Sequence, residues 1–223
     1  MKNNRTGQEG FTLLEIIVVL AVIGALAAML APVVFRYIDD AKRSQAQADG
    51  NTLAAAIQQA YKDTGRWPFY KNGTGKLTYT SGTDASILTS NPACTGAGTA
   101  SACDTTAPND GSTLWALTTG KADSLANQLI LNTPFAGNGG TAYSTGGTRA
   151  WKGPYAERIP TLDPWARSYL VNIGNADPNS EGSSQNWVVV ISAGPNGNLE
   201  TSSAVAGTTN PSAGGDDIIA RVK

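Results

Sequence analysis

The first fifteen residues carry the clearest chemistry of this chain, a peptide bond between Gly10 and Phe11 and the carboxylate of Glu15. Glu15 stands directly before Ile16–Phe35, a run without a charged residue. A segment that only had to sit in a membrane has no use for an acid, so Glu15 requires a cation as its partner. Hydrolysis after Gly10 would expose a free amine on Phe11, and this amine is the nearest candidate for that cation.

The run Ile16–Phe35 is long and apolar enough to cross a bilayer as a helix. Its twenty residues would extend over ~30 Å, and twelve of them are Leu, Ile, Val or Phe, each favouring insertion by ~0.3–0.6 kcal/mol. Lys2 and Arg5 precede the run and mark the cytoplasmic side. In a dry bundle of such helices, Glu15 would be uncompensated unless a cation met it. Cleavage is therefore expected to act as a switch for assembly through Glu15.

A secretory signal peptide is the simplest alternative for this N-terminus, and it fits poorly. The apolar run is longer than a usual signal core, and no small-x-small cleavage site closes it before Arg36. Because the boundary between Gly10 and Phe11 precedes the apolar run, cleavage there would leave the helix on the mature protein. A simple signal anchor stays open as a second alternative.

The string Gly10–Glu15, with its glycine, its FTLLE sequence and the apolar run behind it, resembles the processing site of the type IV prepilin family. That family includes the pseudopilins of type II secretion. The resemblance implies that a prepilin peptidase cuts between Gly10 and Phe11 and that Phe11 is then N-methylated. It also implies that Glu15 pairs with the terminal amine of a neighbouring subunit. The implied partners are the subunit itself, the peptidase, an inner-membrane assembly platform, minor pilins or pseudopilins, and the membrane before assembly.

Beyond the apolar run the helical pattern continues and becomes amphipathic. We expect one helix from about Thr12 to about Asp63, with a kink or melted turn at Gly24 and Pro32. Gly65 supplies a C-terminal stop signal for this helix. The second half of the helix is expected to lie against a small domain and to bury its apolar face there.

This pattern divides the chain into three parts with different expected environments. Residues 1–10 form a leader peptide, residues 11–35 a transmembrane or filament-core helix, and residues 36–223 a periplasmic globular domain. Within that domain, residues 71–150 form a loop-rich insertion, because about half of them are Gly, Ser, Thr or Asn. Such a composition favours loops and short strands over a packed helical layer.

The insertion contains the two cysteines of the chain and one predicted helix. Asp123–Leu131 carries apolar residues at helical spacing. Cys94 and Cys103 lie in the loop-rich part, and a domain delivered beyond the inner membrane meets an oxidising compartment, so we expect a disulfide between them. A redox-active pair or a metal site is disfavoured, since the chain has no histidine and no further cysteine to complete one.

The C-terminal third predicts short strands. Ser168–Ile173 and Trp187–Ser192 are β-branched or aromatic runs that read as an antiparallel hairpin, and Ile218–Val222 adds a last strand. The expected fold class is α+β, a pilin-like fold with one long N-terminal helix packed on a small antiparallel sheet. Trp151–Tyr155 and Asp163–Trp165 resemble the segment before the sheet in the major pseudopilin of type II secretion.

Two further stretches, Ala193–Gly197 and Gly214–Ile218, resemble the two ends of the pseudopilin calcium loop. This resemblance implies a structural calcium ion bound by Asp216 and Asp217 together with backbone carbonyls, and a flexible polar loop suits a cation that needs six to eight oxygens. The pattern departs from the family in a Ser/Thr/Ala-rich insert and in Asn196, which stands where an aspartate is common. A solvated pair of aspartates in a mobile loop stays open as the alternative.

Composition argues against several other functions. The formal net charge of −1 gives no electrostatic footprint for nucleic acid. The absence of histidine from the sequence removes the commonest general base and the Ser-His and Cys-His pairs. The sequence also lacks a Walker-type phosphate loop and a nucleophile elbow. We therefore expect that the protein is not an enzyme.

Together these features predict a structural subunit of a helical envelope filament, most specifically the major pseudopilin of a type II secretion system. The alternative subtype is a type IV pilus subunit for adhesion or motility, which the large insertion over residues 71–150 keeps open. A different class, a membrane-tethered binding module that never polymerises, is the third hypothesis. The expected location is the inner membrane, crossed once with the C-terminal domain in the periplasm, and then a periplasmic or extracellular filament.

Overall fold

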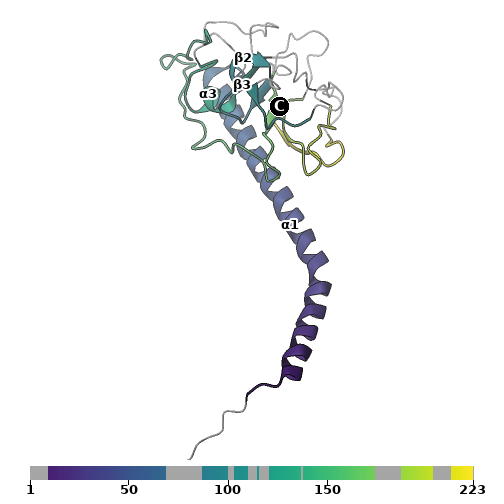
Figure 1. The fold of residues 1–223 in the computed structure, drawn as a ribbon. Coiled ribbons are helices and arrows are strands. Elements are labelled where there is room, and N and C mark those ends of the chain that lie inside the picture. The colour runs from purple at the N-terminus through teal and green to yellow at the C-terminus, as the bar shows by residue number, and fades with distance from the viewer. Residues whose placement is uncertain are drawn as a thin grey trace, which may run out of the picture. The chain divides into compact units, whose positions relative to one another are not determined.

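A computed structural model describes residues 10–68, 87–99, 103–109, 115, 121–136, 138–173, 187–202 and 212–222 of the chain. The chain divides into two compact units, Met1–Lys42 and Arg43–Lys223. Helix α1, Leu13–Thr64, begins in the first unit and ends in the second, and Figure 1 draws it as one uninterrupted coil. The division into leader, filament-core helix and periplasmic domain stays a prediction.

Helix α1 confirms the long helix expected from the sequence, to within one residue at each end. The helix runs through Gly24 and Pro32 without interruption, so the melted turn that we considered there does not occur. Pro32 costs the helix one backbone hydrogen bond. The helix has 52 residues, and the cooperative hydrogen bonds on both sides of Pro32 maintain it across this position. Gly65 follows the last residue, and its amide donates to the carbonyl of Tyr61 at 2.7 Å, which confirms the predicted stop.

The first unit presents apolar side chains on all sides of the helix. Among the described residues, α1 is the one helix long and apolar enough to cross a membrane. Its large exposed hydrophobic residues are Leu13, Leu14, Ile16, Ile17, Val18, Val19, Leu20, Val22, Ile23, Leu26, Met29, Leu30, Val33, Val34, Phe35, Tyr37 and Ile38. A continuous apolar surface of this kind requires cover from lipid or from protein.

Within the second unit, the C-terminal half of α1 buries one face against the sheet. The buried residues recur at helical spacing and include Gly50, Leu53 and Ile57. Gly50 lies close to strand β6, because a Cβ at this position would lie 3.1 Å from the Cβ of Ala220. The side chains of Gln47 and Gln58 bracket this contact. They donate to the carbonyls of Ile219 and Val222 at 3.1 and 2.8 Å.

Among the described residues, the sheet has six short strands in the order β2-β3-β1-β4-β5-β6. Their bounds are β1 Ile87–Thr89, β2 Thr95–Thr99, β3 Lys121–Ser124, β4 Leu170–Asn172, β5 Val189–Ser192 and β6 Ile218–Arg221. The β4–β5 hairpin and β6 confirm the predicted C-terminal strands, and the fold class is α+β as expected. The wholly antiparallel arrangement is wrong, because β1 pairs with β3 in parallel while the other pairings are antiparallel. The sheet is therefore mixed.

The insertion over residues 71–150 supplies half of this sheet as short strands, which its composition favours together with loops. It contributes β1, β2 and β3 and a short helix, α3, Leu125–Leu129, which Figure 1 labels near β2 and β3. The side chain of Ser124 caps α3 by accepting from the amide of Ala126 at 3.1 Å. The predicted helix Asp123–Leu131 thus exists in shorter form, because Asp123 and Ser124 close strand β3.

Alternating strand residues build two hydrophobic clusters. Val171 and Val190 belong to the cluster that contains Leu53 of α1, whereas their neighbours Leu170 and Ile191 belong to the other cluster. Successive residues of a strand point to opposite faces, so the two clusters occupy opposite faces of the sheet. The second cluster also contains Cys94, Trp115 and Leu199. The insertion therefore covers the sheet face that α1 leaves open.

Candidate functional site

The predicted cleavage bond lies in the non-helical stretch before α1. Phe11 is 85% exposed, and a Cβ built at Gly10 would meet no atom within 4 Å. The helix begins two residues later, at Leu13. A protease can therefore reach the bond between Gly10 and Phe11 without unwinding the helix. The structure tests neither the cleavage nor the methylation of Phe11.

The carboxylate of Glu15 closes the first turn of α1 together with Thr12. The amide and the hydroxyl of Thr12 both donate to Oε2 of Glu15 at 2.8 Å, and the amide of Glu15 donates to Oγ1 of Thr12 at 3.3 Å. This reciprocal arrangement is a capping box. This role of Thr12 is not among the predictions from the sequence, although the spacing T-x-x-E from Thr12 to Glu15 is the sequence signal of a capping box. Thr12 uses only Oε2, so Oε1 of Glu15 can still accept a bond from an amine.

The predicted calcium ligands lie in the turn before β6. The amide of Asn196 donates to Oδ2 of Asp216 at 3.0 Å. The amides of Glu200 and Thr201 donate to Oδ2 of Asp217 at 2.8 and 2.6 Å. The backbone after β5 therefore wraps around both carboxylates. This contact brings together the two loop ends that the sequence places about twenty residues apart.

A glycine permits this close approach. Gly194 has φ +61°, and a Cβ there would stand 2.3 Å from the carbonyl oxygen of Asp216. Asn196, which departs from the family pattern, uses its side-chain oxygen to accept from the amide of Asn198 at 2.7 Å. Its side chain thus closes a local turn. The Ser/Thr/Ala-rich insert between the loop ends lies mostly at 203–211, outside the described residues.

One oxygen of each carboxylate is left without a donor. Oδ1 of Asp216 and Oδ1 of Asp217 are buried and have no hydrogen-bond partner among the described residues. Burial raises the pKa of Asp217, and the nearby charge of Glu200 adds to this effect. Buried carboxylate oxygens without donors are unfavourable unless a cation or water compensates them. Carboxylate oxygens of this kind are the ligands that a hard cation such as calcium prefers.

The carboxylates alone do not complete a metal site. Within the part of the chain that the structure describes, no three acidic, histidine or cysteine side chains form a group that could hold a metal ion. A calcium ion at Asp216 and Asp217 would therefore take its remaining ligands from backbone carbonyls and water. Calcium accepts both kinds of oxygen in protein sites.

The two cysteines form the predicted disulfide, Cys94–Cys103, with a sequence separation of nine residues. Cys94 is fully buried in the second hydrophobic cluster, and Cys103 packs against that cluster. The bond fastens the turn before β2 to segment 103–109. Its place in the core indicates a structural disulfide rather than an accessible redox pair.

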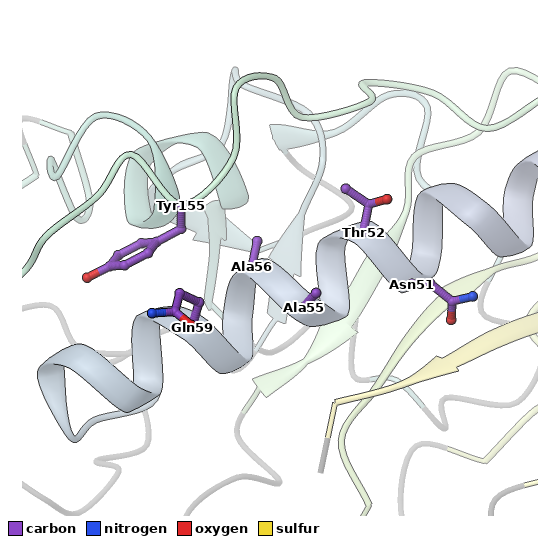
Figure 2. Close-up of a pocket in the computed structure, with 6 residues that line it drawn as sticks. All are labelled: Asn51, Thr52, Ala55, Ala56, Gln59 and Tyr155. Atoms are coloured by element: carbon purple, nitrogen blue, oxygen red, sulfur yellow. The ribbon is translucent and has the colours of Figure 1, made fainter.

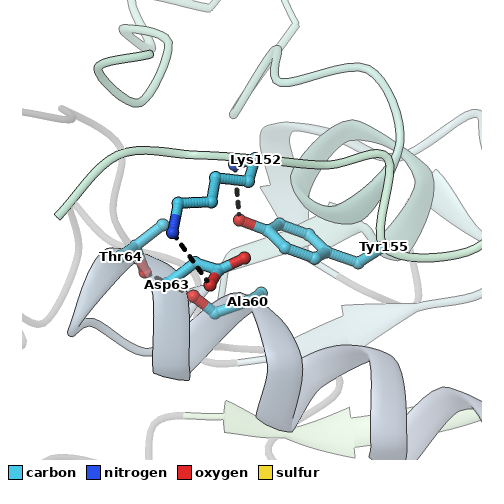
Figure 3. A network of polar contacts seen from close by, with 5 residues as sticks. All are labelled: Ala60, Asp63, Thr64, Lys152 and Tyr155. Atoms are coloured by element: carbon cyan, nitrogen blue, oxygen red, sulfur yellow. Dashed lines mark hydrogen bonds and ion pairs between the residues drawn. The ribbon is translucent and has the colours of Figure 1, made fainter. Parts of the chain in front are cut away.

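A polar network anchors the segment Trp151–Tyr155 to the end of α1 (Figure 3). The ammonium of Lys152 lies 3.8 Å from Oδ1 of Asp63, and the amide of Lys152 donates to the hydroxyl of Tyr155 at 2.9 Å. The side chain of Lys152 is 64% exposed, so the ion pair contributes little to stability.

An open groove lies along α1 beside Tyr155 (Figure 2). Its lining consists of Asn51, Thr52, Ala55, Ala56, Gln59 and Tyr155. This set includes no carboxylate, amine or thiol, and its hydroxyl groups are those of Thr52 and Tyr155.

The comparisons with known proteins agree with the N-terminal geometry. The pattern of the prokaryotic N-terminal methylation motif matches residues 5–31, which include Gly10, Phe11, Thr12 and Glu15. This chain carries that motif. The match covers residues 5–31 alone, so it applies to the N-terminus and not to the globular unit. No solved structure matches the chain.

Several curated proteins are similar to the chain over about a third of its length. The toxin coregulated pilin of Vibrio cholerae is 35% identical over 80 residues, 36% of each protein. The type II secretion system core protein G of Pseudomonas aeruginosa is 39% identical over 73 residues, 33% of this chain and 51% of the relative. The type IV major pilin protein PilE1 of Neisseria gonorrhoeae is 34% identical over 70 residues, 31% of this chain and 42% of the relative.

The matches span about a third to a half of each relative. They confirm the resemblance to pilins and to type II secretion core protein G that the N-terminal string indicates. Because both kinds of protein occur among the relatives, the similarity does not separate a pilus subunit from a pseudopilus subunit.

Proposed function

We propose that this protein is a structural subunit of a helical filament in the cell envelope. One observation carries the proposal, the combination of an exposed apolar helix with an acid in its first turn and an accessible Gly10–Phe11 bond just before it. Similarity to pilins and to a type II secretion core protein supports the same function. No catalytic step is part of the proposal.

The mechanism begins in the inner membrane, which α1 crosses once with the C-terminal unit on the periplasmic side. A prepilin peptidase cleaves after Gly10, and Phe11 becomes the new N-terminus and is N-methylated. An inner-membrane assembly platform, with minor pilins or pseudopilins, then moves the helix from lipid into a core of like helices. The exposed hydrophobic residues of the first unit gain protein contacts there in place of lipid.

Glu15 sets the register of this core in the proposed mechanism. Removal of residues 1–10 places a cationic amine one residue before Thr12, on every subunit. Thr12 occupies Oε2 of Glu15, which leaves Oε1 for the amine of a neighbouring chain. In a dry helical core an acid without a cation is strongly unfavourable, so the pairing selects one axial position between neighbours.

The substitution Glu15→Leu tests this proposal against a tethered binding module. A filament subunit with this substitution should still insert into the membrane and fail to assemble, which electron microscopy of sheared filaments measures. Glu157→Leu, which replaces an exposed acid of the globular unit, is the matched control and should assemble normally. Normal filaments from the Glu15→Leu variant would contradict the proposed role of the carboxylate. A solitary anchored receptor would lose nothing in either variant.

Within this class, we propose the major pseudopilin of a type II secretion system as the subtype. The similarity to type II secretion core protein G and the resemblance carried by Trp151–Tyr155 and Asp163–Trp165 support it. The insertion that builds half of the sheet favours the second candidate, a type IV pilus subunit for adhesion or motility. Deletion of the gene separates them, since loss of a pseudopilin abolishes secretion of folded exoproteins, whereas loss of a pilin abolishes surface filaments.

We also propose that Asp216 and Asp217 bind a structural calcium ion. The buried Oδ1 atoms without donors support this proposal. The ion would neutralise two adjacent carboxylates and hold the loop after β5 against the turn before β6. Chelation should lower the melting temperature of the wild-type protein and leave that of the Asp216→Asn/Asp217→Asn variant unchanged. An equal effect of chelator on both proteins, or no effect on either, would remove the calcium site.

A further inference from the structure

Segment 103–109, which follows the disulfide, runs beside the loop that holds the carboxylates. The amide of Asn109 donates to the carbonyl of Gly197, and the amide of Leu199 donates to the carbonyl of Asn109, both at 2.9 Å. The result is a parallel bridge between Asn109 and Asn198, whose side chains also bond at 3.3 Å. Residues 197–199 lie between the amide that binds Asp216 and those that bind Asp217.

The start of this segment is fixed by the disulfide and by a buried acid. Asp104 follows Cys103 directly, and it is only 2% exposed. Its carboxylate accepts from the hydroxyl of Thr89 at 2.5 Å and from the side-chain amide of Asn91 at 2.8 Å. Both donors come from β1 and the turn after it. Cys94, the other half of the disulfide, belongs to the same turn region, so the segment is fastened to the sheet at two adjacent points.

Trp115 supplies a second connection from the insertion to the carboxylates. Its indole N–H donates to the carbonyl of Thr201 at 2.8 Å, and the amide of Thr201 donates to Oδ2 of Asp217 at 2.6 Å. Trp115 is fully buried in the cluster that contains Cys94 and Leu199. The disulfide, the indole and the loop after β5 therefore pack as one body.

We propose that the insertion is a positioning element for the carboxylate pair, so that the Cys94–Cys103 disulfide and cation binding at Asp216 and Asp217 are thermodynamically coupled. This inference rests on the calcium site proposed above. Calcium requires oxygen ligands in a fixed arrangement, and the groups that orient those ligands strongly affect affinity. Opening the disulfide removes one of the two fastenings of segment 103–109 and so loosens the backbone that holds the two carboxylates in place.

Calcium titration of the full chain in detergent micelles, measured by isothermal calorimetry, tests the coupling. A dithiol such as dithiothreitol breaks the S–S bond, and the two sulfurs take up two electrons and two protons while the reductant becomes a cyclic disulfide. We expect the dissociation constant for calcium to rise roughly tenfold in the reduced protein. By linkage, saturating calcium should lower the equilibrium constant for this reduction by the same factor.

Two tryptophan variants keep the test independent of a disrupted fold. Trp115→Phe keeps an aromatic ring in the cluster and removes the donor to Thr201, so it should weaken calcium binding by roughly threefold to tenfold. Trp151→Phe is the matched control, because the indole N–H of Trp151 is buried without a partner among the described residues. It should bind calcium like the wild type. A purely structural role of Trp115 would lower the calcium-free melting temperature and leave the affinity unchanged.

The outcomes separate this coupling from the calcium site itself. Weaker binding by both the reduced protein and Trp115→Phe, with reciprocal protection of the disulfide by calcium, supports the coupling. Equal affinity in the oxidised, reduced and Trp115→Phe proteins overturns it and leaves the calcium site standing. If the oxidised wild type binds no more calcium than the Asp216→Asn/Asp217→Asn variant, the site and the coupling both fail.

Discussion

Thr12 and Glu15 hold each other at the first turn of α1, with two bonds of 2.8 Å from Thr12 to one carboxylate oxygen and a return bond to the threonine hydroxyl. The acid that the proposed mechanism uses for assembly is therefore also part of a helix cap. The bonds from Thr12 hold the carboxylate of Glu15 in a defined position before a neighbouring subunit binds to it. A preorganised acceptor gives up less conformational freedom when it binds its partner.

Replacement of Thr12 by Val tests the cap directly. The variant loses the hydroxyl that accepts from the amide of Glu15 and donates to its carboxylate. We expect hydrogen exchange of the first-turn amides of α1 to become roughly fivefold faster in micelles, the effect of a typical lost N-cap. Thr12→Ser keeps a hydroxyl and should exchange like the wild type. Equal exchange in all three proteins would show that the cap does not stabilise the turn.

The contact between Gly50 and Ala220 predicts a sharp limit on side-chain size. Gly50→Leu would force a large side chain into a gap where even a Cβ stands 3.1 Å from the Ala220 Cβ. We expect it to destabilise the globular unit by about 1–3 kcal/mol. Ala55→Leu, on the exposed side of the same helix, should be nearly neutral. Thermal unfolding followed by near-ultraviolet circular dichroism compares the two, and similar losses would contradict the assigned packing face.

Asp104 predicts an acid-sensitive contribution to stability. Burial opposes its ionisation, but hydrogen bonds from Asn91, Thr89 and Thr106 outweigh this effect, and the pKa of Asp104 is lowered in the fold. The stabilisation is therefore fully present above the ordinary aspartate pKa and is lost as pH falls through the lower folded value. Melting temperatures measured from pH 6 downward should fall less steeply for Asp104→Asn than for the wild type. Parallel profiles would contradict this role.

Thr89→Val provides a graded version of the same experiment. It removes the donor to Oδ2 of Asp104 and keeps the shape of the side chain nearly unchanged. The pKa of Asp104 should then rise toward its ordinary value, so the acid-dependent loss of stability should be smaller than in the wild type and should be complete at a higher pH. A loss of stability as large as that of the wild type, ending at the same pH, would contradict the role of this hydrogen bond.

The sequence predicted those elements whose pattern is local and strong. The extent of α1 follows from a continuous apolar run, an amphipathic stretch and Gly65, and the β4–β5 hairpin follows from two β-branched runs. It did not predict β2, because Thr95–Thr99 reads T-G-A-G-T and has the composition of a loop. It also did not predict the parallel pairing of β1 with β3, since neither strand has a pattern that selects a partner.

The sites show the same division. The N-terminal motif that contains Gly10, Phe11 and Glu15 was predictable because its residues lie together in the sequence, while their roles in cleavage and assembly stay predictions. The disulfide was predictable because the chain has one pair of cysteines. The contacts around Asp217 were not readable, because its donors are backbone amides at Glu200 and Thr201. Backbone donors depend on conformation rather than on residue type. The same reason hides the link from Trp115 to Thr201.

The central claim is that proteolysis at Gly10 creates the cation that Glu15 requires. Mass spectrometry of the N-terminal peptide tests it most directly, on the full chain produced together with an active prepilin peptidase. The account predicts a mature N-terminus at Phe11 that carries one added methyl group. A chain that still begins at Met1 under these conditions, or one that begins beyond Phe35, would contradict it.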